Sequence, residues 1–290
     1  MKENPSANIL RITFAVLGAF LIFIFTDAAL LECTLLNDRF IHDFLNSKDV
    51  KEYLMEVTDD SGLTLHDIMR ESGIEDEHNE EISEAFLDIG LEDITDLVLN
   101  GDTSTDEDKW DDFFDEYGDE IFENMQGSSA DRRELEREML SEYEDALEKY
   151  LDEYEDSEAY DFFNSFKKWH NTAKMTAVIT GTIIIAMTVA LLAIHRNRFL
   201  PVRAMGISAT VAEGLNLAGW GLIAFIFDLI KEEARHEEEI ILILLNSIGK
   251  HLTLIIGVVA ASFAAGIALI VIGVVGSKNC QNTDDQDYEG

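Results

Sequence analysis

The chain has 290 residues, of which 47% are hydrophobic, and its 58 acidic residues against 21 Lys and Arg give a formal net charge of −37. This excess of negative charge repels nucleic-acid phosphates, so nucleic acid is excluded as a partner. The charge is also segregated, since 45 of the acidic residues but only 11 of the basic ones lie between Glu32 and His170, an interval bracketed by long apolar runs. We therefore predict a membrane protein that holds a strongly acidic domain on one side.

Four apolar runs are long enough to be transmembrane helices. A helix needs about 20 mostly apolar residues to cross a hydrocarbon core about 30 Å thick. The runs that qualify are residues 9–31, 175–194, 204–227 and 252–276. Helices of soluble cores rarely stay apolar on every face for this long, so a soluble protein is the disfavoured alternative.

The first run, 9–31, can also be interpreted as a cleaved signal peptide. Basic Lys2 precedes it, and Ala28 and Ala29 supply small residues near its end. The run is long for a signal core, and Asp27 lies where a cleavage consensus would form. We expect a retained span; cleavage would leave three spans and would not move the acidic domain to the other side.

Residues 32–174 form the predicted acidic domain, and their periodicity is helical. Apolar residues return every three or four positions, without the alternation that strands require. One predicted helix places Trp110, Phe113 and Phe114 on one face. No Gly or Pro occurs from residue 130 to 169, which predicts a long helix or helical pair that joins the domain rigidly to the second span. The predicted fold class is all-α, a polytopic membrane protein with four transmembrane helices and an acidic all-helical extracytoplasmic domain between spans 1 and 2.

The aromatic residues and carboxylates of this domain each have two interpretations. The aromatic stripes are typical of the core of a small helical bundle, and a ligand pocket is the alternative. The segment from Asp102 to Asp106 has Glu107 where a calcium-binding loop requires glycine, so that motif is absent. Residues 75–81 are able to bind a divalent ion loosely, although a solvated acidic face is the preferred interpretation. We predict no metal site and no cofactor.

Basic residues in the short loops predict the orientation. Lys and Arg accumulate on the cytoplasmic side of a membrane. Arg196, Arg198 and Arg203 lie in or beside the short connection between the second and third spans, whereas residues 228–239, after the third span, hold six acidic residues and two basic ones. We predict a multi-pass plasma-membrane protein. Residues 1–31 comprise a cytoplasmic N-terminus and the first span, the acidic domain is extracytoplasmic, and residues 277–290 form a cytoplasmic acidic tail.

The two cysteines cannot form a disulfide within one chain of this topology. Cys33 is predicted outside the membrane and Cys280 inside it. Cys33 is able to join two subunits, but an unpaired thiol without a role is the preferred interpretation.

Glu213 is the most informative residue of the predicted spans. It lies about ten residues into the third span, near the bilayer centre, where an ionised carboxylate is costly and needs a partner or a proton. Asn216 follows one turn later, and Thr176, Thr180 or Thr182 of the second span are candidate hydroxyl partners. Glu213 either binds a proton or small cation during conformational change, or is a protonated hydrogen-bonding link between helices.

Small residues predict close helix packing in the fourth span. Gly257, Ala261 and Ala265 repeat every four residues and form a smooth strip against which another helix can pack, within one chain or between chains. Residues 240–245 precede this span. They either extend the fourth helix or lie along the outer interface. We favour a bent or interfacial segment, because a continuous apolar helix from 240 to 276 would exceed the thickness of the membrane.

Two resemblances concern the whole arrangement. The order of a span, a large outer domain and three further spans resembles the permease subunits of mechanotransmitting and cell-division ABC systems, in topology alone. The segment 35–40 (LLNDRF) through 49–54 (DVKEYL), after a first span, is similar to uncharacterised bacterial four-span membrane proteins with a large helical extracytoplasmic loop. That resemblance implies a bacterial cell membrane, and it transfers no catalytic residue.

No catalytic motif occurs in the chain, which has neither a His-Glu-x-x-His zinc motif nor a phosphate-binding glycine loop. We therefore expect a non-enzymatic integral membrane sensor, scaffold or accessory subunit. Its acidic domain would bind a cationic envelope ligand or another membrane protein, and a homo-oligomer is compatible with the packing strip. The alternative is a small ion- or proton-coupled transporter that uses Glu213.

Overall fold

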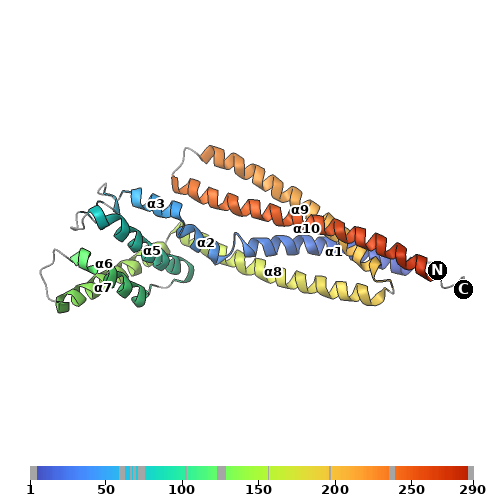
Figure 1. The fold of residues 1–290 in the computed structure, drawn as a ribbon, viewed down its shortest axis with the longest axis horizontal. Coiled ribbons are helices and arrows are strands. Elements are labelled where there is room, and N and C mark those ends of the chain that lie inside the picture. The colour runs from blue at the N-terminus through green and yellow to red at the C-terminus, as the bar shows by residue number, and fades with distance from the viewer. Residues whose placement is uncertain are drawn as a thin grey trace. The chain divides into compact units, whose positions relative to one another are not determined.

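The structure is a computed structural model, and it describes residues 5–58, 63–65, 67, 70, 76–101, 103–122, 129–155, 157–195, 197–234 and 239–286. These residues are almost entirely helical (Figure 1). Among them, the one β-type pairing is an isolated antiparallel bridge between Thr58 and Thr64. The predicted all-α class is confirmed.

The chain divides into two compact units. The first, which we call the long-helix unit, comprises Met1–Asn37, Lys168–His236 and Leu245–Gly290. The second, the acidic unit, comprises Asp38–Lys167 and Glu237–Leu244. Residues 167 and 168 at their boundary belong to one helix.

Four helices supply the long-helix unit: α1 (Pro5–Cys33), most of α8 (Glu158–Ile194), α9 (Phe199–Glu233) and α10 (Glu239–Gln286). Each contains a stretch long and apolar enough to cross a membrane, which confirms the predicted number of such helices. The helices extend beyond the predicted spans because polar residues with good helix propensity continue them at their ends.

The prediction for residues 240–245 was wrong. They are not bent away from the fourth span but belong to α10, which runs for 48 residues without interruption. At about 1.5 Å per residue, this helix is about 72 Å long, more than twice a hydrocarbon core of about 30 Å.

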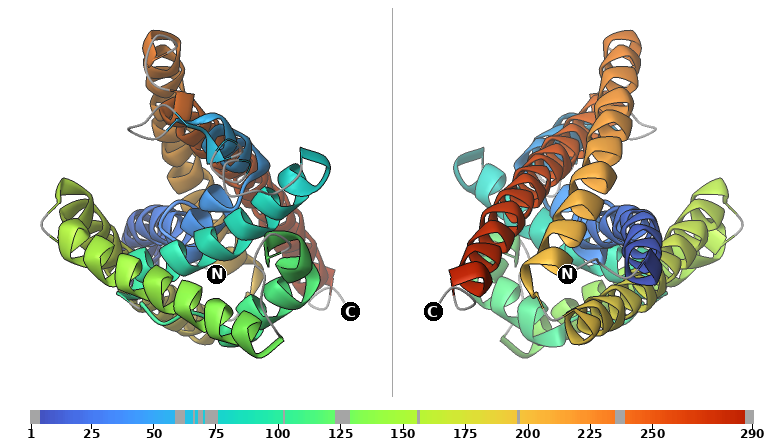
Figure 2. Two further views of the ribbon diagram at one scale, coloured as in Figure 1. Left: turned by 90° about the vertical axis from the view of Figure 1, so that its left-hand side faces the viewer. Right: turned by 90° about the vertical axis from the view of Figure 1, so that its right-hand side faces the viewer.

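Side-chain contacts define how the long helices run. Ser208 of α9 contacts Ala15 of α1, and further along both helices Glu213 contacts Thr26, so α1 and α9 are parallel. Gly206 lies against Ile270 of α10, which is antiparallel to α9. The right-hand view of Figure 2 shows α1 between α8 and α9. This alternation matches four successive membrane crossings.

The acidic unit is built from short and medium helices. They are α2 (Asp38–Leu45), α3 (Lys48–Glu56), α5 (Asp76–Asn100), α6 (Glu107–Phe122), α7 (Ser129–Glu155) and the start of α8. The hydroxyl of Ser47 caps α3 by accepting a hydrogen bond from the amide of Val50, and Gly101, with φ 66°, follows the last residue of α5. The views in Figures 1 and 2 show α6 against α5 and α7.

The predicted aromatic face of α6 forms the core of this unit. Trp110, Phe113 and Phe114 are buried together with Ile82 of α5. The indole ring of Trp110 lies 4.9 Å from the ring of Tyr143 on α7, between ring centroids. Each buried aromatic ring contributes hydrophobic area and edge or tilted ring contacts to stability. The interpretation of this stripe as a bundle core is therefore supported by the packing.

Candidate functional sites

Glu213 lies in a buried contact between α9 and α1. Its side chain is 3% exposed, and the hydroxyl of Thr26 donates a hydrogen bond of 2.7 Å to Oε1 of Glu213. α9 brings Glu213 to this contact because Ala212, Glu213 and Asn216 recur at helical spacing on its buried face. A buried glutamate therefore links α9 to α1 through a residue that is 187 positions away in sequence.

A second polar link joins the same two helices. The indole nitrogen of Trp220 donates a hydrogen bond of 2.9 Å to Oδ1 of Asp27. Asp27 follows Thr26 directly, so α1 supplies two adjacent polar residues to the α1–α9 contact. We did not predict either as a partner of Glu213. The signal available in the sequence was Asp27, an acidic residue inside an apolar run, which we interpreted only in terms of cleavage.

Three buried polar atoms near this contact make no hydrogen bond of good geometry within the described part of the chain, although the side-chain amide of Asn216 lies close to the carboxylate of Glu213. They are Oε2 of Glu213 and both polar side-chain atoms of Asn216, a residue that is 1% exposed. Buried polar groups are nearly always paired, so such atoms mark a place where a proton, a water molecule or a small cation completes the bonding. Glu213 and Asn216, which the sequence singled out together, thus lie in one polar cluster.

For two of the three candidate hydroxyl partners from the second predicted span, Thr180 and Thr182, the prediction was wrong. Thr180 donates to the carbonyl of Thr176 at 2.6 Å, and Thr182 donates to the carbonyl of Val178 at 2.7 Å, both within α8. A threonine hydroxyl in a helix readily bonds the carbonyl four residues earlier, which removes it as a donor to another helix. Thr26 donates to Glu213 instead.

Glycines of α9 and α10 bring these helices into close contact. A methyl group placed on Gly206 would lie 2.7 Å from the backbone nitrogen of Ile270 and 2.9 Å from the carbonyl oxygen of Gly266. Gly273, seven residues after Gly266 on the same face, lies against the backbone of Arg203. Only glycine permits this approach of two backbones.

The predicted packing strip lies on another face of α10. Gly257, Ala261 and Ala265 are exposed, and a methyl group on Gly257 would meet no atom within 4 Å. Buried Val259 is two positions from Gly257, which places them about 160° apart around the helix. The strip does not form the α9–α10 contact, and its use between chains stays a prediction.

The acidic unit contains an aromatic-lined cavity of about 320 Å³. Its walls include Tyr154 of α7, and Tyr160 and Phe163 of α8. The rings of Tyr154 and Tyr160 are 5.6 Å apart and nearly perpendicular, and Phe163 lies 6.3 Å from Tyr154. The cavity also includes Gly101, where α5 ends, so the carbonyl end of a helix dipole borders it.

Tyr154 is the buried polar group of this cavity. It is 7% exposed, and its hydroxyl has no hydrogen-bond partner within the described part of the chain. Burial, together with nearby Tyr150 and Tyr160, raises the pKa of Tyr154 to about 12, so the hydroxyl keeps its proton at neutral pH. Exposed Lys167 also lines the cavity. The site therefore offers aromatic faces, the hydroxyls of Tyr154 and Tyr160, two asparagine side chains and one lysine.

Several cations of the acidic unit are already paired. Lys51 pairs with Asp88, Lys109 with Glu92, and the guanidinium of Arg132 with Glu136. Basic residues are scarce in this interval, so these pairs leave most of the surface carboxylates without a positive neighbour. The acidic unit therefore presents a field that attracts cations.

Some predicted features lie outside the described residues. They are Lys2, Asp102, Arg196, the loop after α9 at 235–238, and the side chains of residues 75–77, of Cys280 and of the rest of the acidic tail from residue 279 on. The side chains of residues 78–81 are described. In the described part, no group of three or more His, Cys, Asp and Glu side chains is arranged to hold a metal ion. Cys33 is described, and it is a free, exposed thiol.

In its described residues, the fold is that of an all-helical protein with four helices long and apolar enough to cross a membrane and a separate acidic helical unit, which is consistent with a multi-pass membrane protein. Comparison with family models, curated proteins and solved structures found no match for this chain.

Proposed function

We propose that this chain is a non-enzymatic membrane sensor or accessory subunit whose acidic unit binds a cationic ligand outside the plasma membrane. The observation that carries the proposal is the aromatic-lined cavity around Tyr154. The predicted orientation, with both termini in the cytoplasm, places this cavity on the extracytoplasmic side. The four apolar helices would anchor the sensing unit and connect it to partner proteins.

The chemistry of the cavity favours an organic ammonium group. Aromatic faces attract ammonium ions through the ring quadrupole, and groups of aromatic residues around a cavity recognise such ligands. The carbonyl end of α5, at Gly101, adds partial negative charge. The hydroxyl of Tyr154 lacks a partner, so it remains able to bond the ligand or its hydration water. Lys167 opposes a cation at this site, and no Asp or Glu lines the cavity; the attraction for cations would come from the 45 acidic residues between positions 32 and 170.

Binding of spermidine to the purified full chain tests this proposal. Isothermal titration in lipid nanodiscs should detect saturable binding that weakens as salt is raised, because screening shortens the range of the acidic field. Tyr160→Ala should reduce the affinity by about fivefold to thirtyfold, since a desolvated cation–aromatic contact contributes about 1–2 kcal/mol.

A matched pair of tyrosines on α7 distinguishes the cavity from the general acidic field. Tyr154 is buried in the cavity, whereas Tyr150, four residues earlier, is 50% exposed. Tyr154→Phe should weaken spermidine binding and Tyr150→Phe should not. Equal affinities for the two variants, or binding that disappears entirely at physiological salt, would contradict a specific site.

A second function is favoured by the polar cluster between α1 and α9. The carboxylate of Glu213 and the side-chain amide of Asn216 are buried beside each other with hydrogen-bonding capacity to spare, and a second carboxylate, Asp27, follows Thr26 on α1. Two acidic residues next to unsatisfied polar atoms are typical of a site that exchanges protons or small cations. The chain would then be a small ion- or proton-coupled transporter.

Flux through liposomes tests this alternative. Proteoliposomes that carry a pH-sensitive or sodium-sensitive dye should show a flux that Glu213→Gln abolishes. Glu233→Gln, at the exposed end of the same helix, is the control and should leave the flux unchanged. A folded wild-type protein without flux of protons or sodium under an imposed gradient would exclude this function and leave Glu213 as a structural link.

A further inference from the structure

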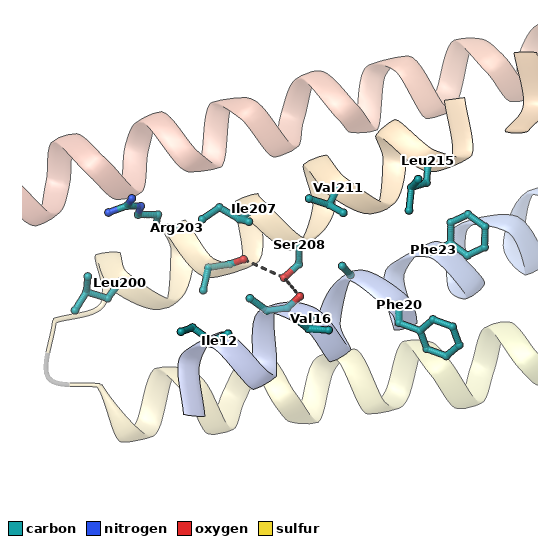
Figure 3. Close-up of a pocket in the computed structure, with 13 residues that line it drawn as sticks. Ile12, Val16, Phe20, Phe23, Leu200, Arg203, Ile207, Ser208, Val211 and Leu215 are labelled. Atoms are coloured by element: carbon teal, nitrogen blue, oxygen red, sulfur yellow. Dashed lines mark hydrogen bonds between the residues drawn. The ribbon is translucent and has the colours of Figure 1, made fainter. Parts of the chain in front are cut away.

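The long-helix unit has a groove between α1 and α9, with a volume of about 730 Å³, that neither proposed function uses. Figure 3 shows Ile12, Leu200 and Arg203 at one end, and Phe20, Phe23 and Leu215 toward the other. Its size is in the range of small-molecule sites, which are about 300–1,000 Å³. The walls are apolar except for Ser208 and Arg203.

The two polar lining residues differ in what they can offer. The hydroxyl of Ser208 bonds the carbonyl oxygens of Ala15 at 2.8 Å and Ala204 at 3.0 Å, so it is committed to α1 and α9. Arg203 is exposed, and no carboxylate among the described side chains pairs with it. The groove therefore suits a molecule that is apolar along its length and anionic at one end.

The length of the groove corresponds to one leaflet of a bilayer. Arg203 and Leu215 are twelve residues apart on α9, about 18 Å at 1.5 Å per residue. Half of a hydrocarbon core of about 30 Å is about 15 Å. A transmembrane helix from a partner would use the whole core thickness, whereas a lipid acyl chain occupies half of it. The groove length favours a lipid.

The position of Arg203 agrees with that of a lipid headgroup. Arg203 is ten residues from Glu213, so if Glu213 lies near the bilayer centre, Arg203 lies about 15 Å away, at the edge of the hydrocarbon core. Its backbone is fixed against α10, because a methyl group on Gly273 would lie 2.6 Å from Cβ of Arg203. Two further exposed cations add positive charge near Arg203: Arg198 directly precedes α9, and Lys278 lies in the C-terminal part of the antiparallel α10.

We propose that the α1–α9 groove binds an acyl chain of an anionic phospholipid, with the lipid phosphate beside Arg203. Basic pockets between membrane helices bind anionic headgroups by charge and hydrogen bonding. The guanidinium supplies a forked set of donors that fits a phosphate. The acyl chain covers Val16, Phe20 and Leu215, which are all at least 60% exposed in the structure.

Native mass spectrometry of the full chain tests this assignment. The protein, purified in detergent, is titrated with phosphatidylglycerol and separately with phosphatidylcholine. We expect one phosphatidylglycerol to bind in preference to phosphatidylcholine, and Arg203→Gln to weaken that binding about fivefold, the contribution of one basic side chain to anionic-lipid attraction. Glutamine keeps the Cβ and Cγ that pack near α10, so folding should be preserved.

A matched pair of valines tests the groove itself. Val16 lines the groove and is 66% exposed, while Val178, on α8 outside the groove, is 64% exposed. Val16→Trp should fill the groove and displace the lipid, and Val178→Trp should not. Equal lipid binding by these two variants, or no preference for phosphatidylglycerol in the wild type, would overturn the proposal. Disulfide-linked dimers of a Val16→Cys variant would also overturn it, because a second copy would then cover the groove.

Discussion

Gly206 provides a direct test of how α9 and α10 pack. A methyl group added there would lie 2.7 Å from the backbone nitrogen of Ile270 and 2.9 Å from the carbonyl oxygen of Gly266. Optimal separations between non-bonded heavy atoms are about 3.5–4.0 Å. Both obstacles are backbone atoms, so they cannot rotate away, and the two helices must separate by about 1 Å to reach that optimal separation.

Gly257 is the control for this substitution. A methyl group at Gly257 on α10 meets no atom within 4 Å. Alanine gains about 1 kcal/mol of helix propensity over glycine at either position, so this gain cancels in the comparison. Overpacking costs about 1–3 kcal/mol. Gly206→Ala should therefore be less stable than Gly257→Ala by about that amount.

Unfolding of the purified full chain measures the difference. The protein in mixed micelles is titrated with SDS, and loss of helical structure is followed by circular dichroism for wild type, Gly206→Ala and Gly257→Ala. We expect the midpoint of Gly206→Ala to be the lowest of the three and that of Gly257→Ala to equal or exceed wild type. A lower midpoint for Gly257→Ala than for Gly206→Ala would refute the assigned packing face, and would show that the predicted strip carries the contact.

Three further predictions concern the acidic unit and the orientation. Burial raises the pKa of Asp93 in the folded protein, although the hydrogen bond from Trp110 acts in the opposite direction. The folded state therefore binds the proton of Asp93 more tightly than the unfolded state does. The resulting contribution to the free energy of unfolding is fully present below the ordinary pKa of an aspartate and is lost as the pH rises through the raised pKa of the folded protein. The free energy of unfolding of Asp93→Asn, measured with a chemical denaturant, should therefore increase relative to that of wild type as the pH rises from 4 to 7. Asp111→Asn, at an exposed position, should not show this change. Raising salt from about 10 to 150 mM shortens the screening length from about 30 to 8 Å and should raise the thermal midpoint of the full chain, whereas an unchanged midpoint would contradict the importance of self-repulsion. A membrane-impermeant maleimide should label exposed Cys33 in intact cells and leave Cys280 unlabelled until lysis; the reverse pattern would invert the proposed orientation.

Features that repeat along the chain were predictable. The four apolar helices follow from run length, and the core face of α6 follows from aromatic spacing, because both depend on residues close in sequence. The end of α5 at Gly101 was predictable for the same reason, since a residue with positive φ favours glycine. Glu213 stood out because its charge contrasts with its immediate neighbours.

Features that depend on the choice of partner were not predictable. Several helices offered hydroxyls to Glu213, and the parallel contact of α1 with α9 selected Thr26. Similarly, α10 carries small residues on two faces, and the position of Gly206 selects the face of Gly266. Helix periodicity shows which residues share a face, but it does not show which neighbour that face meets. The interruption expected near residue 240 failed because membrane thickness limits only the part of a helix that lies in lipid.

The polar links between α1 and α9 also constrain the order in which the chain is assembled. The partners of Thr26 and Asp27 are made 187 and 193 residues later, after the segment Asp38–Lys167 of the acidic unit. During synthesis the carboxylate of Asp27 on α1 therefore has no Trp220 to pair with until about two thirds of the protein has been translated after it. A helix in that position is expected to remain beside the insertion machinery, or bound to a membrane chaperone, until α9 arrives to release it.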